Sequence, residues 1–212
     1  MAPSRDSYRF GRSEMLDYLS ALDEALSGGP PVHLIVCGGA SMIWRYDDRL
    51  SSDIDVLNSL LDDRTHAAVL EVAGRFGIHH DWMNDSVSRH QLLPHFERER
   101  MYTGRNLTVD SVSGQALIAM KVLAGRDNDL RDAARLAADL DVTTYDEIYD
   151  AVTETYDWEF PGGTADWSDN IEPILARAAE LRTKQGKVGL WQRLRRLVRD
   201  DKTRYPSEMK PR

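Results

Sequence analysis

A short apolar run that ends in two glycines is the feature that most constrains how this chain can fold. Residues 32–37 have the composition of a strand covered on both faces, and Gly38-Gly39 ends it. Residues 40–45 then predict the beginning of a helix, and residues 53–57 predict the next strand. The sequence therefore predicts a strand, a glycine turn, a helix and a second strand in close succession.

This arrangement suits the binding of a phosphate-bearing ligand and a metal ion. Two glycines let the backbone turn sharply and approach a ligand, and the amides at the start of the following helix offer donors to phosphate oxygens. Asp53 and Asp55 are two positions apart on the second strand, so their carboxylates project from one face. Adjacent carboxylates repel each other unless a cation lies between them, and Mg²⁺ favours one or two carboxylates together with substrate phosphates. We therefore predict that Asp53 and Asp55 hold Mg²⁺, with Gly38 and Gly39 beside the phosphates.

The rest of the chain alternates helices with strands and then continues with helices only. Helical spacing is found at residues 13–26, 62–76, 113–124, 129–140, 145–155 and 171–182, and strand-like runs at residues 78–82 and 107–112. This order predicts an α/β (α+β) core with a helical C-terminal part. We divide the chain into a core at residues 1–140, C-terminal helices at residues 141–182 and a basic tail at residues 183–212.

The net charge of -8 conceals an acidic body and a basic tail. Residues 183–212 hold 10 Lys and Arg against 3 Asp and Glu, a net charge of +7, which leaves -15 for residues 1–182. An acidic body argues against a broad nucleic-acid footprint on the core, because that affinity comes mainly from cationic side chains on phosphates. The tail has an apolar stripe at helical spacing, formed by Leu190, Trp191, Leu194, Leu197 and Val198, opposite Arg193, Arg195, Arg196 and Arg199. Such a pattern is typical of a helix that packs on its own domain or on a partner, and RNA binding is the alternative.

The single cysteine and the hydropathy of the chain indicate the cellular compartment in which we expect the protein. Cys37 is the single cysteine, so neither a disulfide framework nor a cysteine-based zinc site is available. Residues 1–10 are polar and charged, and no apolar run approaches the roughly 18–20 residues of a membrane helix. We expect a soluble, cytoplasmic protein without a membrane partner.

The order and spacing of the glycine turn and the Asp53-Asp55 pair resemble the nucleotidyltransferase superfamily. Two further segments resemble its bacterial toxin-like and abortive-infection-type members. One is the helix-and-turn at residues 117–132, which carries Lys121, Arg126, Asp129 and Asp132, and the other is the run Asp81-Trp82-Met83-Asn84-Asp85. The resemblance covers roughly residues 30–140 and implies a mixed sheet flanked by helices.

Lys121 is unusual because the helix around it is otherwise apolar. Burial of its ammonium is costly unless it meets an anion, which predicts either a nucleotide triphosphate, a pairing with Asp129 or an escape to the surface. Asp129 and Asp132 lie about one helical turn apart, so they can orient Lys121 or Arg126 or bind nucleotide; favourable placement of acids in a first helical turn is the plainer alternative. The resemblance makes Lys121 and Asp129 catalytic candidates and Arg126 and Asp132 nucleotide-binding candidates.

The chain departs from the family pattern in two places. Many members have Gly-Ser at the turn, whereas here the run is Gly38-Gly39-Ala40-Ser41, and Ser41 is our choice for a phosphate contact. The superfamily often adds a third metal-binding carboxylate from a later strand. Asp110 is the best position for it, and Asp85 is the competitor.

The resemblance implies a Mg²⁺-dependent nucleotidyltransferase that moves a nucleoside monophosphate from an NTP to a macromolecular acceptor, a tRNA or a protein. It also implies the role of a toxin in a toxin-antitoxin pair, with a cognate antitoxin as partner. Two alternatives belong to other classes: a non-catalytic nucleotide-binding module, and an antitoxin-like interaction protein that uses the basic tail.

Overall fold

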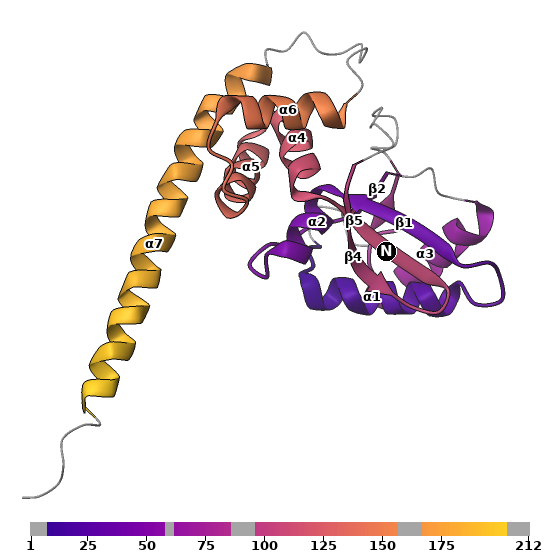
Figure 1. The fold of residues 1–212 in the computed structure, drawn as a ribbon. Coiled ribbons are helices and arrows are strands. Elements are labelled where there is room, and N and C mark those ends of the chain that lie inside the picture. The colour runs from indigo at the N-terminus through magenta and orange to yellow at the C-terminus, as the bar shows by residue number, and fades with distance from the viewer. Residues whose placement is uncertain (1–7, 58–61, 86–95, 157–166, 203–212) are drawn as a thin grey trace, which may run out of the picture.

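A computed structural model of the chain describes residues 8–57, 62–85, 96–156 and 167–202, with side chains through residue 186. Its first part contains both strands and helices, and helices alone make up its last part (Figure 1). This confirms the predicted mixed α/β fold with a helical C-terminal part. The elements are α1 (Arg12–Ala25), β1 (Val32–Cys37), α2 (Gly38–Arg45), β2 (Ile54–Val56), α3 (Asp63–Phe76), β3 (Met83–Asn84), β4 (Arg98–Thr103), β5 (Leu107–Val112), α4 (Gly114–Ala124), α5 (Asp127–Asp139), α6 (Tyr145–Thr155), η2 (Trp167–Asn170) and α7 (Ile171–Lys202).

The five strands form one mixed sheet in the order β3-β2-β1-β5-β4. The central strand β1 runs parallel to β5 and antiparallel to β2, while β3 runs parallel to β2 and β4 antiparallel to β5. In this register Cys37 lies opposite Asp55, and Ile35 lies opposite Asp110. Strand β1 therefore stands between the two strands that carry the predicted carboxylates.

Alternation along β1 divides its side chains between two apolar cores. Leu34 and Val36 join the core that also contains apolar side chains of α1 and α3. Ile35 and Cys37 join the second core, which contains the buried faces of α4, α5 and α6 and the first turns of α7. Both faces of β1 are thus covered, as its apolar composition predicted.

The predicted strand at residues 78–82 was wrong. Ile78 donates its backbone N–H to Ala73 at the end of α3, and Trp82 donates to His79, so these residues form a turn. Strand pairing begins one residue later, at Met83. Trp82 is fully buried, and its indole N–H donates to Val69 O at 3.0 Å, which anchors the turn to α3.

Helix α7 runs without interruption from Ile171 to Lys202, and Figure 1 shows it extending away from the remaining helices. The compositional boundary after residue 182 lies inside this helix. The division into core, helices and tail stays a prediction. Within the described part of the chain, none of the helices has both the length and the apolar character that crossing a bilayer requires.

Candidate active site

The first glycine of the turn lies against the carboxylate of the second aspartate. Gly38 follows β1 and has a φ of 61°, a left-handed conformation that favours glycine. A Cβ at this position would lie 2.7 Å from Asp55 Oδ2. Both the backbone conformation and the space therefore demand glycine, and the backbone of the turn touches the Asp55 side chain.

The second glycine makes room for the loop that carries the first aspartate. A Cβ on Gly39 would lie 2.2 Å from Ser51 Oγ. Ser51 Oγ in turn contacts Asp53 Oδ1 at 3.5 Å. The backbone N–H and C=O of Ser51 form hydrogen bonds with the backbone C=O and N–H of Phe10. The two glycines thus allow the start of α2 to lie against Asp55 and against Ser51, the neighbour of Asp53. Ser51 was not among the residues predicted from sequence.

Three charged side chains gather around the end of β1. Asp55 lies opposite Cys37 in the β1-β2 ladder, and Asp53 lies directly before β2. Burial raises the pKa of the Cys37 thiol, Asp55 and Asp53 raise it further, and Lys121 acts in the opposite direction. Asp53, Asp55 and Lys121 therefore all lie in the neighbourhood of this buried thiol.

Asn84 is a neighbour of the pair that we did not assign to the site from sequence. It lies opposite Asp55 in the parallel β2-β3 ladder. Directly opposed residues in a ladder share a face, so the Asn84 amide and the Asp55 carboxylate stand side by side. Asp85, the competitor for the third carboxylate, follows immediately in the chain. The tryptophan-containing run singled out in the sequence thus reaches the site through this short strand.

Lys121 meets two carboxylates of the next helix. The residue is only 6% exposed, and its Nζ lies 2.9 Å from Asp129 Oδ1 and 2.9 Å from Asp132 Oδ2. Lys121 thus pairs with Asp129, which was one of the three predicted arrangements, and it also forms an ion pair with Asp132. The two aspartates one turn apart on α5 therefore orient the Lys121 ammonium, as their spacing suggested.

The loop between α2 and β2 is tied to the same carboxylate. Arg49 Nη2 lies 2.8 Å from Asp132 Oδ2, the oxygen that also forms the ion pair with Lys121 at 2.9 Å. Beside this pair, Arg135 of α5 reaches back to both oxygens of Asp48 at 2.7 and 3.0 Å. Two ion pairs thus fix the loop that precedes Asp53 to α5. The loop supplies the arginine of one pair and the carboxylate of the other. Sequence reasoning missed Arg49, because its partner Asp132 lies 83 positions away in the chain.

Ser41 and Arg126, two predicted nucleotide-binding residues, have different surroundings. Ser41 is fully buried, donates its hydroxyl to Val36 O at 3.1 Å and accepts from Ser111 Oγ at 2.8 Å. Its hydroxyl is therefore engaged inside the protein. Arg126 is exposed at the N-cap position of α5, directly before the turn that carries Asp129.

Asp110 lies on β5, two strands away from Asp55. Because β1 separates the two strands, their backbones are roughly 10 Å apart. Asp110 Oδ2 lies 2.7 Å from His33 Nε2, and its Oδ1 accepts from Arg100 Nε. Burial opposes ionisation of Asp110, but the hydrogen bonds from Arg100 and His33 outweigh it and lower the pKa. The structure thus places Asp110 in an ion-paired cluster of its own and does not bring it to the Asp53-Asp55 pair.

A separate group of three potential metal ligands among the described residues is His79, His80 and Asp81, on the turn after α3. His80 Nε2 lies 3.4 Å from Asp81 Oδ1, and the Asp81 backbone N–H donates to His79 Nδ1 at 3.1 Å. Imidazole nitrogens suit zinc and other transition metals better than Mg²⁺. The oxygen ligands that Mg²⁺ prefers are instead at Asp53 and Asp55, beside the Gly38 backbone, and this donor set fits the ion.

Comparison with known proteins now defines the class. A family model described as a nucleotidyltransferase of unknown function (DUF6036) matches residues 14–169, which is most of the chain. The chain therefore belongs to this nucleotidyltransferase family, and the predicted superfamily is confirmed. No curated protein and no solved structure matches it. The likeness to toxin-like and abortive-infection-type members stays a prediction.

Proposed function

We propose that the protein is a Mg²⁺-dependent enzyme that transfers a nucleoside monophosphate from an NTP to a hydroxyl of a tRNA or protein. The observation that carries the proposal is the contact between the Gly38 backbone and the Asp55 carboxylate. This contact puts a phosphate-binding turn and a metal ligand at one point, which is what a site for metal-bound triphosphate requires.

In this proposal Asp53 and Asp55 hold Mg²⁺, which neutralises charge on the phosphates. The backbone amides at the start of α2, from Gly38 and Gly39 onward, donate to phosphate oxygens. The acceptor hydroxyl attacks the α-phosphorus in line and loses its proton to water. A bond from the acceptor oxygen to that phosphorus forms, and the bond to the bridging oxygen breaks, releasing pyrophosphate. The fixed backbone donors cost no reorganisation as charge develops.

The charged network around Lys121 supports the same site from the helical side. Asp129 and Asp132 pair with the almost wholly buried Lys121 ammonium and fix its direction. Its positive charge offsets part of the negative charge of the Asp53-Asp55 pair. We assign the exposed Arg126 to the outer phosphates of the NTP.

The role as a toxin of a toxin-antitoxin pair belongs to the same proposal. It rests on the resemblance of residues 81–85 and 117–132 to toxin-like members, and the pairing of Asn84 with Asp55 in the β2-β3 ladder supports the inclusion of the first segment in the site. The excess of acidic residues in the body restricts a nucleic-acid acceptor to a small contact area or to the basic tail.

The test is transfer of label in a cell extract that contains Mg²⁺ and each α-labelled NTP in turn. The native chain is compared with the double variant Asp53→Asn/Asp55→Asn and with Asp17→Asn, which removes one exposed carboxylate of α1. Label should appear on RNA or protein with the native chain and with the Asp17 variant only. Equal labelling by the double variant would refute the assignment of the two aspartates.

A second candidate is a non-catalytic nucleotide-binding module. The observation that favours it is the engagement of Asp110, our first choice for the third carboxylate, by His33 and Arg100. This candidate predicts Mg²⁺-dependent NTP binding without release of pyrophosphate. Calorimetric titration with each NTP, combined with a pyrophosphate assay on the same samples, distinguishes it from the enzyme.

A further inference from the structure

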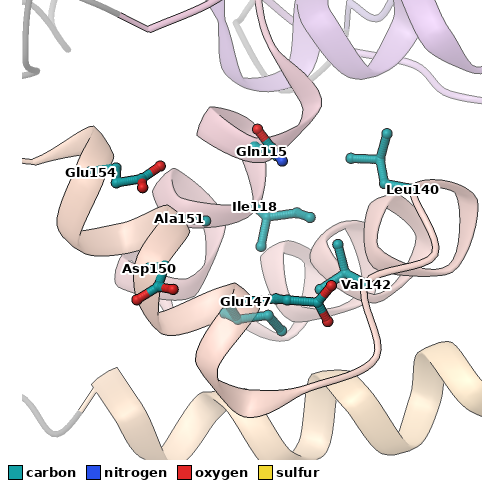
Figure 2. Close-up of a pocket in the computed structure, with 9 residues that line it drawn as sticks. Gln115, Ile118, Leu140, Val142, Glu147, Asp150, Ala151 and Glu154 are labelled. Atoms are coloured by element: carbon teal, nitrogen blue, oxygen red, sulfur yellow. The ribbon is translucent and has the colours of Figure 1, made fainter.

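Two of the cavities in the described part of the chain differ in charge. Figure 2 shows the first, which has a volume of about 270 Å³ and whose lining includes Glu147, Asp150 and Glu154 of α6. The second has a volume of about 290 Å³, and its lining includes Arg131 near the beginning of α5 and Arg177 near the beginning of α7. We refer to the second as the arginine pocket. Phosphate oxygens are repelled by the acidic cavity and attracted by the arginine pocket.

The two arginines of the arginine pocket meet no carboxylate of the described residues. Both are exposed, and neither takes part in the ion pairs that the arginines elsewhere in the described part of the chain form. Asp127 also lines the pocket, but it is not within ion-pair distance of either guanidinium. Acids are in excess in residues 1–182, which carry a net charge of -15. Two unpaired arginines in one pocket of such a body therefore point to an anion that is supplied from outside.

The guanidinium of Arg131 is held in place without being neutralised. Its Nε donates to the backbone oxygen of Asp127 at 3.2 Å, and its Nη2 donates to Asn128 Oδ1 at 2.5 Å. Both acceptors are uncharged, so Arg131 keeps its positive charge while its orientation is fixed. A guanidinium that is already oriented loses less side-chain entropy when it binds a phosphate. The positive ends of the α5 and α7 dipoles lie on the same side of the pocket's residues and add to the attraction.

The other residues of the lining suit the base of a nucleotide. Leu130 and Pro173 provide apolar surface that the face of a base can cover. Asp127 provides carboxylate oxygens, which accept hydrogen bonds from the exocyclic amino group of a base. The volume of about 290 Å³ lies at the lower end of the roughly 300–1,000 Å³ of ligand sites. The pocket is therefore suited to a single nucleotide unit rather than to a whole NTP.

The arginine pocket and Lys121 lie on different sides of α5. Arg131 lines the pocket toward α7, whereas Asp129 and Asp132 turn toward Lys121 of α4. An α-helix with its side chains is about 10–12 Å wide, so roughly this distance separates the pocket from the Lys121 ammonium. The pocket thus lies beyond the predicted NTP site but close enough to it for a chain of several nucleotides to reach both places.

We propose that the arginine pocket holds one nucleotide of a single-stranded RNA acceptor, remote from the hydroxyl that reacts. Arg131 and Arg177 bind its phosphate. Leu130 and Pro173 contact its base, and Asp127 accepts from the amino group of that base. The inference rests on the proposed function and selects RNA rather than protein as the acceptor. It agrees with the acidic body, which leaves only a small area for contact with RNA phosphates.

The test is the fluorescence anisotropy of a short labelled single-stranded RNA titrated with the full chain, without NTP or Mg²⁺. We expect Arg131→Ala/Arg177→Ala to bind at least tenfold more weakly. Its slope of log K against log salt should be smaller by about 0.7, the value for one phosphate of a single strand. The control Arg75→Ala/Arg105→Ala removes the same charge from exposed positions on α3 and on the turn between β4 and β5, and it should bind like the native chain. A native chain that fails to bind RNA, or a pocket variant that is folded by circular dichroism and binds like the control, would overturn the proposal.

Two further measurements separate RNA from the NTP as the source of the phosphate. Calorimetric titration with Mg²⁺ and NTP should give the same affinity for the native chain and for Arg131→Ala/Arg177→Ala. Loss of NTP affinity with RNA affinity unchanged would assign the pocket to the NTP and overturn the proposal. The variant Asp53→Asn/Asp55→Asn should bind RNA like the native chain while it transfers no label. Failure of the proposed enzyme and failure of the RNA pocket are thus observed in different assays.

The choice of base tests the role of Asp127. Cytosine and adenine carry an exocyclic amino group and uracil does not, so oligo(C) and oligo(A) should bind several-fold more tightly than oligo(U). In Asp127→Ala this preference should disappear, while the affinity for oligo(U) rises because a negative charge has been removed. Equal affinity of the native chain for the three oligonucleotides would overturn the assignment of Asp127 to the base.

Discussion

Replacement of Gly38 by alanine provides the sharpest test of the site geometry. A non-glycine residue in the left-handed region costs roughly 1–2 kcal/mol. At Gly38 the new methyl would also lie 2.7 Å from Asp55 Oδ2. Because the neighbouring atom belongs to the end of the Asp55 side chain, the carboxylate can rotate away from the methyl. It then no longer lies beside the glycine turn. We expect about 1–3 kcal/mol of lost stability together with loss of Mg²⁺-dependent NTP binding.

Alanine substitutions at two other glycines separate the cost of the left-handed backbone from the effect of the contact with Asp55. Gly28 has a φ of 82°, but a methyl group there would meet no neighbouring atom within 4 Å, so alanine at this position carries the backbone cost alone. Gly74 lies in α3 with open space and an ordinary φ, so alanine there should stabilise the helix by about 0.5–1 kcal/mol. Urea unfolding measures the three stabilities, and calorimetric titration measures NTP binding. The reasoning fails if Gly38→Ala binds metal and NTP as Gly28→Ala does.

Three further predictions concern the charged clusters. Lys121→Met should cost about 3 kcal/mol in urea unfolding, because it leaves buried carboxylates without their shared cation; a cost below about 1 kcal/mol would contradict this. Arg49→Met should cost more than Arg135→Met, since Arg49 pairs with the buried Asp132 whereas the partner of Arg135 is exposed; equal costs would count against the difference in burial. The lowered pKa of Asp110 means that its carboxylate stabilises the fold above the ordinary value of about 3.9, and that this contribution disappears as the pH falls through the lowered pKa. Asp110→Asn should therefore be less stable than the native chain at pH 5.5, and the difference in stability should shrink as the pH falls below about 3.9; a difference that stays constant would exclude this linkage.

Local pattern alone identified the elements that build the site. The apolar run, the two glycines and the alternation of Asp53 and Asp55 are properties of neighbouring residues, and short-range geometry decides which side chains share a strand face. The same holds for Asp129 and Asp132, because positions three apart share the face of any helix. These features could be predicted because no distant segment has to be placed to derive them.

Only the tertiary structure decided which of these elements meet. The sheet order puts β1 between β2 and β5, so Asp110 joins His33 and Arg100, while the short strand β3 brings Asn84 to Asp55. Packing of α4 on α5 gives Lys121 two carboxylates, one of which also binds Arg49 from a loop 83 positions earlier in the chain. Residue spacing carries little information on such long-range pairings, because they depend on the order and direction of whole strands and helices. The sequence determined the pieces of the site, and the fold decided which of their charges meet.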